Sequence, residues 1–435
     1  MSNAKGDAAE ASVARQISGA KGYWVLLALV AGLAGGALAG RLGDGLREPA
    51  LQSAAMVGGL WINGLQMAVI PLIVALLITG IAQGAEAARA GRIGGRSVLW
   101  FVIVCTASAI FGALLMPVLL QFFPMSQGAS EALRAGLAAI DPGATSGTVP
   151  AVADFFRTIV PQNAISAAAN GEVLPLVVFT LIFALALTRI EPARRRSIVG
   201  FFEGISDALL VVIGWVLWIA PLGVFALAFA VGAGAGGAAF AGLAHYIVLV
   251  SVLGVLVTLA GYVIAVAAGR VPLGIFAKSM IAPQAVAIST QSSLASLPAM
   301  LGAARLIGIA ERVADVTLPL AVALFRATGP AMNIAVAIYI AHWFGLEITA
   351  ERLIAGTAVA AVVSYGAVSL PGQISFFTSI APIAMAMGVP VAPLALLAAV
   401  EMIPDIFRTV GNVTLDVAVT TAVNRGESDP QPAAS

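Results

Sequence analysis

Charge is the property that this sequence has least of. Only 10% of its 435 residues are charged and 60% are hydrophobic, whereas about 25% of the residues of a soluble domain are charged. Residues 208–269, 279–304 and 353–400 contain no charged side chain at all. A soluble core of this size cannot hide such stretches from water, so the sequence excludes a soluble protein.

The long apolar runs decide the fold class. A helix needs about 20 apolar residues to cross a bilayer, and only helices and closed barrels satisfy every backbone polar group there. The runs are too long and too continuous for barrel strands, so we predict an all-α integral membrane protein. Residues 208–269 alone have room for two helices and a turn.

Other scarcities exclude further classes of protein. The net charge of +1 offers no basic surface, so we expect no nucleic-acid partner. The single cysteine, Cys105, cannot form an intrachain disulfide, and His245 and His342 have no partner at metal-ligand spacing. No nucleophile–base pair or phosphate loop is visible, so we expect neither an enzyme nor a bound cofactor.

Six plain apolar segments come first along the chain, and we predict each to be helical. They are residues 23–40, 54–80, 98–123, 173–187, 208–231 and 246–268. In the first, glycines at four-residue spacing (Gly32, Gly36, Gly40) would allow close helix packing. The general richness in glycine, 46 residues in all, explains this spacing equally well.

Basic residues predict the orientation in the membrane. With the N-terminus inside, the inner loops before residue 280 hold twelve lysines and arginines and the outer loops hold four, an asymmetry typical of cytoplasmic loops. We therefore expect a multi-pass protein of the plasma (inner) membrane with both termini cytoplasmic. Residues 1–20 and 425–435 would be tails, and the polar link 124–172 would lie outside.

After residue 275 two apolar stretches are interrupted by polar residues and proline. The interruptions, residues 289–298 and 364–372, each contain Ser-Leu-Pro, and each stretch is followed by a helix bearing Phe-Arg, at 325–326 and 407–408. We interpret this as an internal repeat of a hairpin and a broken helix. Paired, interrupted segments of this kind indicate a transporter binding site, because irregular backbone at membrane depth must be buried or line a cavity.

The last helix carries polar residues on one face. Asp405, Thr409, Asn412 and Asp416 recur at three- or four-residue spacing, with Arg408 among them. Charges at membrane depth are costly, so such residues are functional by default, although an Asp405–Arg408 pair could merely satisfy itself. In a functional site Arg408 would grip a carboxylate and Asp405 an ammonium group. Thr409 and Asn412 would add hydrogen bonds, and Asp416 would offer oxygen to a cation.

Motifs along nearly the whole chain together indicate one family. They are residues 61–72, 159–163, 169–174, 201–204 and 218–227, Ser292-Ser293 with Ser296-Leu297-Pro298, Leu370-Pro371-Gly372, and Arg408-Thr409 with Asn412, Thr414 and Asp416. Through these motifs the chain resembles the glutamate-transporter-like family of dicarboxylate/amino-acid:cation symporters. The resemblance implies eight transmembrane helices and two re-entrant hairpins in inverted repeats, assembled as a homotrimer. Residues 21–85 and 170–235 would form a static scaffold, and residues 96–124, 243–270 and 275–424 a mobile transport domain.

The same resemblance assigns roles to single residues. Asp405 would take the substrate's amino group, Arg408 its side-chain carboxylate, and Thr409 and Asn412 its α-amino-acid end. Asn412 and Asp416 would belong to a sodium site. The hairpin tips would enclose the substrate through Ser292, Ser293 and the backbone from Gly366 to Pro371.

The seventh helix departs from the family's pattern. Where the family has Asn-Met-Asp-Gly-Thr, whose Asn and Asp ligate sodium, this chain has Phe325-Arg326-Ala327-Thr328-Gly329, and the first hairpin has Gln291 before its serines instead of arginine. Three interpretations of Arg326 stay open. It is a tethered cation that replaces a sodium ion and pairs with Asp416, or a second grip for a two-carboxylate substrate, or a substitute for the missing hairpin arginine.

These features together predict a secondary active transporter. It would carry an acidic amino acid (aspartate or glutamate) or a C4-dicarboxylate by an elevator mechanism, coupled to Na⁺ or H⁺, with protons carried by Glu401, Asp405 or Asp416. Its partners would be the small carboxylate substrate, the lipid bilayer and further copies of the chain. The alternative is an uncoupled exchanger, anion channel or substrate sensor of the same fold, which the missing sodium motif favours.

Overall fold

The computed structural model describes residues 22–40, 44–89, 91–126, 128, 130–131, 134, 159–235, 238–365 and 372–425. Throughout these ranges the regular structure is helical, with no β-strand. Six helical stretches of the described chain are long and apolar enough to cross a membrane. The predicted all-α membrane class is therefore confirmed at this level.

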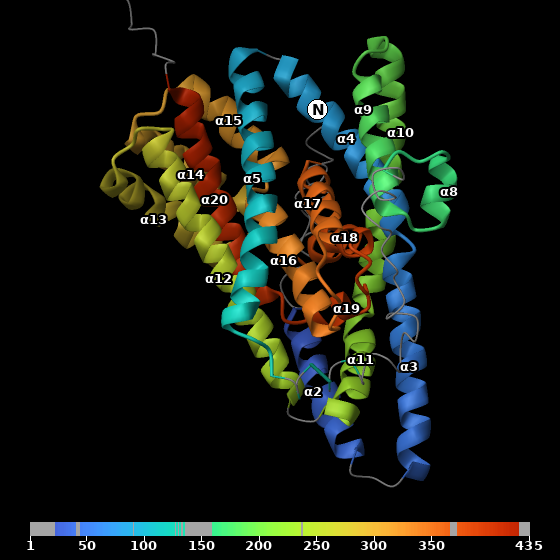
Figure 1. Ribbon diagram of the computed structural model, residues 1–435. Helices are drawn as coiled ribbons and strands as arrows, with labels where there is room; N and C mark the ends of the chain where they lie inside the picture. Colours follow the sequence, from blue (N-terminus) through green and yellow to red (C-terminus); the bar gives the residue numbers. More distant parts are fainter. Residues whose placement is uncertain are drawn as a thin grey trace, which may run out of the picture.

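Figure 1 labels most of the described helices in their order along the chain. Their bounds are α2 Gly22–Ala39, α3 Asp44–Gln66, α4 Val69–Arg89, α5 Arg92–Phe122, α8 Ala164–Ala169, α9 Val173–Leu187, α10 Pro192–Trp218, α11 Ala220–Ala235, α12 Ala238–Ala267, α13 Leu273–Thr290, α14 Ser293–Ile307, α15 Glu311–Leu324, α16 Thr328–Trp343, α17 Ala350–Ser364, α18 Gly372–Ala386, α19 Pro393–Leu397 and α20 Met402–Asn424.

Two of the segments that we predicted to be helical contain a short interruption. Residues 54–80 span the end of α3 and the start of α4, and residues 208–231 span the end of α10 and most of α11. Pro71 is the third residue of α4, and Pro221 is the second residue of α11. Proline has no N–H and its ring crowds the carbonyl four residues earlier, which accounts for the interruption within each predicted helical segment.

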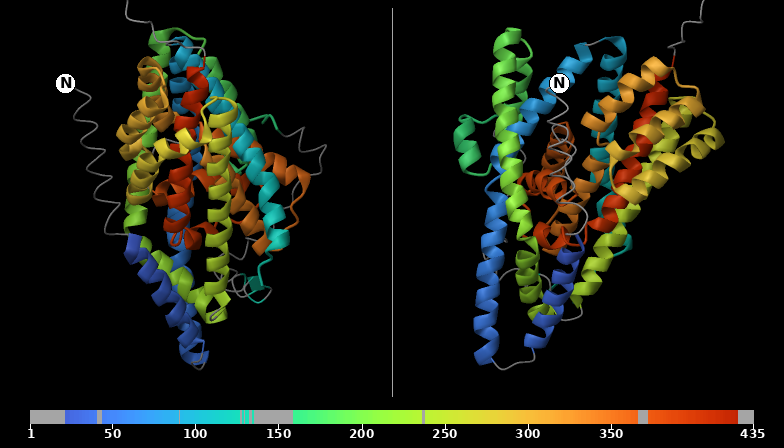
Figure 2. Two further views of the ribbon diagram at one scale, coloured as in Figure 1. Left: turned by 90° about the vertical axis from the view of Figure 1, so that its left-hand side faces the viewer. Right: turned by 180° about the vertical axis from the view of Figure 1, so that it is seen from behind.

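The helices pack in two groups that lie on opposite sides of the molecule. On one side α11 packs against α2 and α3, and α4 packs against α9 and α10. On the other side α12 packs against α20, α13 against α14, and α16 against α5 (Figure 1; Figure 2, right). Helix α18 contacts α16 and α17 as well as α4, α9 and α10, so it lies between the groups.

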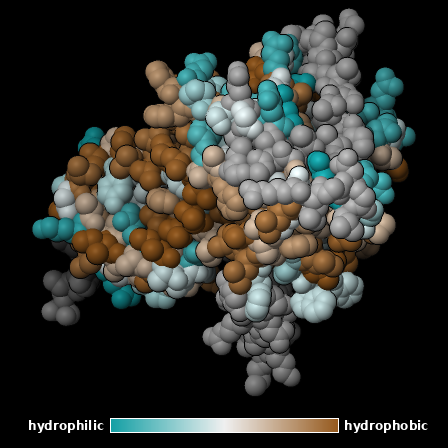
Figure 3. All heavy atoms as spheres, turned by 90° about the horizontal axis from the view of Figure 1, so that it is seen from below, coloured by the Kyte–Doolittle hydropathy of each residue, from teal (hydrophilic) through white to brown (hydrophobic). Residues whose placement is uncertain are grey.

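Large apolar side chains face outward along single helix faces. On α12, Val248, Val252, Val255, Leu259 and Val263 are exposed at three- or four-residue spacing, which is one continuous stripe on a helix. Seen from below, apolar residues cover much of the visible described surface (Figure 3). Exposed apolar area this continuous marks contact with lipid or with another protein.

The glycine spacing in α2 reflects a close helix contact. A Cβ atom at Gly32 would lie 2.5 Å from the Phe225 carbonyl oxygen of α11, and one at Gly36 would overlap the Phe229 carbonyl oxygen. Since the backbones touch, only glycine fits at these two positions. The closely packed interpretation of this spacing is therefore the correct one.

The interruptions after residue 275 lie where we predicted, with one correction. Helix α13 ends at Thr290, Gln291 takes a left-handed conformation with φ of 50°, and the Ser292 hydroxyl caps α14 by accepting from the Ala295 N–H. Pro298 lies inside α14 and not in the break. Helices α17 and α18 flank the second interruption at Ser364 and Gly372.

Candidate functional site

The break between α15 and α16 is fixed by contacts from two other helices. Phe325 is extended, 1% exposed, and its ring stacks on Phe101 of α5 with centroids 4.5 Å apart. The Thr328 N–H and hydroxyl lie 3.0 and 2.7 Å from Asn412 Oδ1 of α20. Asn412 thus satisfies an N–H group at the start of α16, which no intrahelical carbonyl can reach, and holds Arg326 beside α20.

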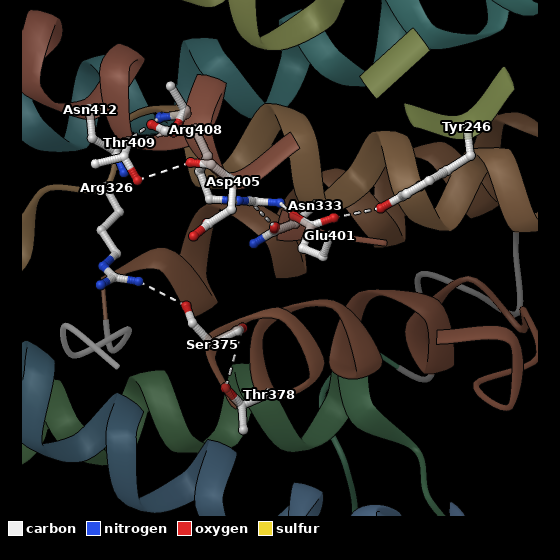
Figure 4. A network of polar contacts seen from close by, with 11 residues as sticks. Tyr246, Arg326, Asn333, Ser375, Thr378, Glu401, Asp405, Arg408, Thr409 and Asn412 are labelled. Atoms are coloured by element: carbon white, nitrogen blue, oxygen red, sulfur yellow. Dashed lines mark hydrogen bonds and ion pairs between the residues drawn. The ribbon is translucent and has the colours of Figure 1, made fainter. Parts of the chain in front are cut away.

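The Arg408 guanidinium is the centre of a buried polar cluster (Figure 4). Its Nη2 atom donates to Glu401 Oε1 at 2.7 Å, and its Nη1 atom donates to Asn333 Oδ1 of α16 at 2.6 Å. Its Nε atom lies 3.6 Å from Asp405 Oδ1. Only 11% of the Arg408 side chain is exposed. Breaking a buried pair of this kind costs about 3–5 kcal/mol, so the network strongly stabilises the charge.

Helix α12 contributes one further contact to this cluster. The Tyr246 hydroxyl donates to Glu401 Oε2 at 2.7 Å. Glu401 is 2% exposed and Tyr246 is fully buried. Both oxygens of the Glu401 carboxylate therefore accept hydrogen bonds, one from an arginine and one from a tyrosine (Figure 4).

Arg326 reaches away from α20 toward the second interrupted pair of helices. Its Nη1 atom donates to Ser375 Oγ of α18 at 2.8 Å (Figure 4). The charged groups near the Arg326 guanidinium are the carboxylates of Asp405 and Asp416 and the guanidinium of Arg408. The guanidinium thus connects α18 to the charged face of α20.

Asp416 lies deeper along α20 and is completely buried. Neither of its carboxylate oxygens has a hydrogen-bond partner among the described residues. The nearby positions 325 and 327 hold phenylalanine and alanine, so they supply no side-chain oxygen. A buried carboxylate without a hydrogen-bond partner requires a nearby cation or a proton.

The comparison with protein families decides which proteins this arrangement belongs to. The model of the sodium:dicarboxylate symporter family matches residues 22–426. The chain belongs to this family. The family resemblance that the motifs predicted is therefore confirmed. The family consists of transporters, which supports the prediction that the chain is not an enzyme.

Named relatives of this symporter-family chain fall into two groups by substrate. It is 29% identical to a proton/sodium-glutamate symport protein of Bacillus subtilis (strain 168), with 87% of each chain covered. It is 26% identical to a proton/glutamate-aspartate symporter of Escherichia coli (strain K12), over 93% of this chain and 92% of the relative. A C4-dicarboxylate transport protein of Laribacter hongkongensis (strain HLHK9) is 27% identical over 86% and 83%.

The structure brings some of the predicted residues together. Asp405, Arg408 and Arg326 share one charged region, and Asn412 lies at its edge (Figure 4). Thr409 donates its hydroxyl to the Asp405 carbonyl oxygen of its own helix at 2.9 Å. The polar face predicted for the last helix is therefore present in α20.

Other predicted residues are placed differently or not at all. Ser292 caps α14, and no hydrogen bond that the described structure gives to Ser292 or Ser293 reaches the α20 cluster. Gly366 and Pro371 lie outside the described residues. Neither Asp416 oxygen has a hydrogen-bond partner among the described residues, so the structure gives no hydrogen bond between Asp416 and Arg326 there.

Three residues of this cluster were not predicted as site residues from the sequence. Tyr246, Asn333 and Ser375 come from helices far along the chain from the residues they bond. Asn333 could have been found, since it is an amide inside a fully apolar stretch of α16, where polar residues are rare and functional. Tyr246 and Ser375 carry no such signal.

Proposed function

We propose that this protein is a secondary active transporter that takes up an acidic amino acid or a C4-dicarboxylate together with a cation. The observation that carries the proposal is the buried Arg408 guanidinium, flanked by carboxylates, beside the α15–α16 break. A planar guanidinium binds a carboxylate bidentately. Asp405, 3.6 Å from the Arg408 Nε atom, would receive the amino group of aspartate or glutamate.

The charges of the site support coupling to a cation. Glu401, Asp405 and Asp416 face Arg326 and Arg408, which leaves one net negative charge when all five groups are ionised. An acidic amino acid adds a further negative charge and a dicarboxylate adds two. Charges at membrane depth are costly, so a bound substrate would need a proton or a metal cation to cross with it.

The arrangement of the helices supports the elevator mechanism that we propose. The group containing α12–α16 and α20 would move with the substrate, and the group of α2, α3, α4, α9, α10 and α11 would stay fixed in a homotrimer of the inner membrane. Helix α18 would slide at their boundary, where it contacts α4, α9 and α10. The transport domain would thus comprise residues 96–124, 243–270 and 275–424.

Arg326 would supply a positive charge at the position where the family's motif binds a sodium ion. Phe325 and Ala327 offer no oxygen ligand, and Asn412 Oδ1 already accepts from Thr328. A sodium site at this break would therefore have Asp416 as its main side-chain ligand. The same loss of oxygen ligands favours the second candidate, an uncoupled exchanger, channel or sensor that still binds the substrate.

Ligand binding by the purified protein tests the proposal. Thermal stability in detergent would be measured with aspartate, glutamate and succinate, with leucine as the matched neutral control. We expect at least one acidic ligand to raise the unfolding temperature in proportion to the logarithm of its concentration, and leucine to leave it unchanged. Stabilisation by leucine, or by none of the acidic ligands, would show that the substrate class is wrong.

A further inference from the structure

We propose that a cavity at the end of α20 binds the phosphate group of an anionic membrane phospholipid through Arg270 and Asn424. The cavity has a volume of about 200 Å³ and is partly open to the surface. One water molecule needs about 10–15 Å³ of such space, so the cavity has room for a much larger group. From the helical rise, Asn424 lies about 24 Å along α20 from Arg408, so this site is separate from the one on which the proposed function rests.

The cavity lies where several helices of one group begin or end. Helix α20 contacts α12, α13 and α14 (Figure 1). The walls of the cavity are the last turn of α20, the link from α12 to α13, the first turn of α13 and the end of α14. Among the described residues that line it, Arg270 is the one charged side chain and none is acidic. A lining of this charge favours an anion.

Two side chains of the lining have hydrogen-bond donors that the described chain does not use. The Arg270 guanidinium has no hydrogen-bond or ion-pair partner among the described residues. Asn424 accepts the Ala310 N–H at its Oδ1 atom at 3.1 Å, which fixes the amide and leaves its Nδ2 atom without a partner in the described chain. A guanidinium binds phosphate bidentately, and the amide adds a further donor. Both residues line the same cavity, so one phosphate group can accept from both.

The backbone of Arg270 supports a role for its side chain. Its φ of 58° is left-handed, and among the described residues other than glycine only Gln291 shares such a conformation. Glycine adopts it without strain, whereas an arginine does so at a conformational cost. Strained residues of this kind cluster at functional sites and ligand clamps. The strain at Arg270 is therefore a second observation, independent of the cavity, that indicates a ligand.

The surface beside the cavity is apolar, which favours a lipid over a soluble anion. Val263 and Val266 near the end of α12 are exposed, as are Leu273 and Ile275 in the first turn of α13, and Ile275 also lines the cavity. Acyl chains lie along these side chains while Arg270 holds the phosphate. Basic pockets between helices on the cytoplasmic side bind anionic lipid headgroups, and we expect this end of the molecule to face the cytoplasm.

Thermal unfolding of the purified protein in detergent tests the site with three probes. Phosphatidylglycerol carries a charged phosphate and acyl chains, phosphatidylcholine with the same chains carries no net charge, and glycerol phosphate has the phosphate without the chains. We expect phosphatidylglycerol to raise the unfolding temperature by several degrees in a saturable way, and the other two probes to leave it nearly unchanged. An equal rise with phosphatidylcholine, or no rise with phosphatidylglycerol, would overturn the proposal. An equal rise with glycerol phosphate would overturn the lipid as the ligand and assign the cavity to a soluble phosphate compound.

Two variants remove the donors while keeping the local structure. Arg270→Gly relieves the left-handed strain, so without lipid it should be at least as stable as wild type, yet it should lose the effect of phosphatidylglycerol. Asn424→Asp keeps an acceptor for the Ala310 N–H but replaces the Nδ2 donor by a carboxylate oxygen, so half-saturation should need about tenfold more lipid. Arg194→Gln removes an exposed arginine of α10 that pairs with Glu191, and as the matched control it should respond as wild type. A full lipid response in Arg270→Gly, or a lost response in Arg194→Gln, would overturn the proposal.

Discussion

At the scale of the residue, Arg408 depends on its shape as much as on its charge. Its three nitrogens face three different side chains, from Glu401, Asn333 and Asp405. A lysine at this position would keep the charge but present a single ammonium group on a flexible stem. The planar fork is therefore the property to test.

We predict that Arg408→Lys lowers the affinity for an acidic substrate by about ten- to a hundredfold, because the bidentate contact with the carboxylate is lost. Equilibrium binding of labelled substrate to the purified variant measures the effect. The control is Arg305→Lys, which changes an arginine that is 70% exposed and paired with Glu311. Equal affinities of Arg408→Lys and wild type would remove Arg408 from the substrate contacts.

Asn412 has a structural task that can be measured separately from binding. We predict that Asn412→Ala destabilises the protein by about 1–3 kcal/mol, since the buried Thr328 N–H loses its acceptor. Denaturant unfolding in detergent would show the loss. The matched variant Thr409→Val removes a hydroxyl that bonds only its own helix and should cost much less. An unchanged stability of Asn412→Ala would contradict the contact.

The sequence predicts the α20 residues of the site because their spacing lies within one helix. Asp405, Arg408 and Asn412 share a face at any reasonable choice of helix bounds. The contacts of Arg408 with Asn333 and of Tyr246 with Glu401 join residues 75 and 155 positions apart. Periodicity carries no information about such contacts, because they depend on how separate helices pack.

At the scale of the element, the contact between α2 and α11 sets a strict limit on side-chain size. We predict that Gly36→Ala lowers the unfolding temperature in detergent by several degrees, since its Cβ atom would overlap the Phe229 carbonyl oxygen. The control is Gly35→Ala in the next position, where the nearest atom lies 3.6 Å away on the flexible Phe229 ring. A Gly36→Ala variant as stable as Gly35→Ala would contradict the close approach.

The existence of most helices could be predicted from composition, and their interruptions only in part. Val173–Leu187 agrees with its predicted bounds, because apolar residues begin and end sharply there. The breaks at Pro71 and Pro221 were missed because both lie inside continuous apolar runs. Pro298 was placed in the first break but lies inside α14, since proline is tolerated when neighbouring groups satisfy the freed carbonyl.

At the scale of the whole molecule, an apolar exterior surrounds a charged interior. Exposed valine and leucine residues follow the outer face of α12, while Arg408 and Glu401 are almost fully buried and paired. Such a molecule is stable in a bilayer only with its charges neutralised. Binding of an acidic substrate would add negative charge to this interior, so in the proposed mechanism a cation moves together with the substrate.

The most direct test of that claim is accumulation of labelled aspartate in proteoliposomes under proton and sodium gradients imposed separately, with succinate as the second substrate. We expect an inward gradient of protons or of sodium to drive accumulation above the external concentration. Equilibration without accumulation under either gradient, with exchange against internal substrate retained, would contradict cation-coupled transport by this protein.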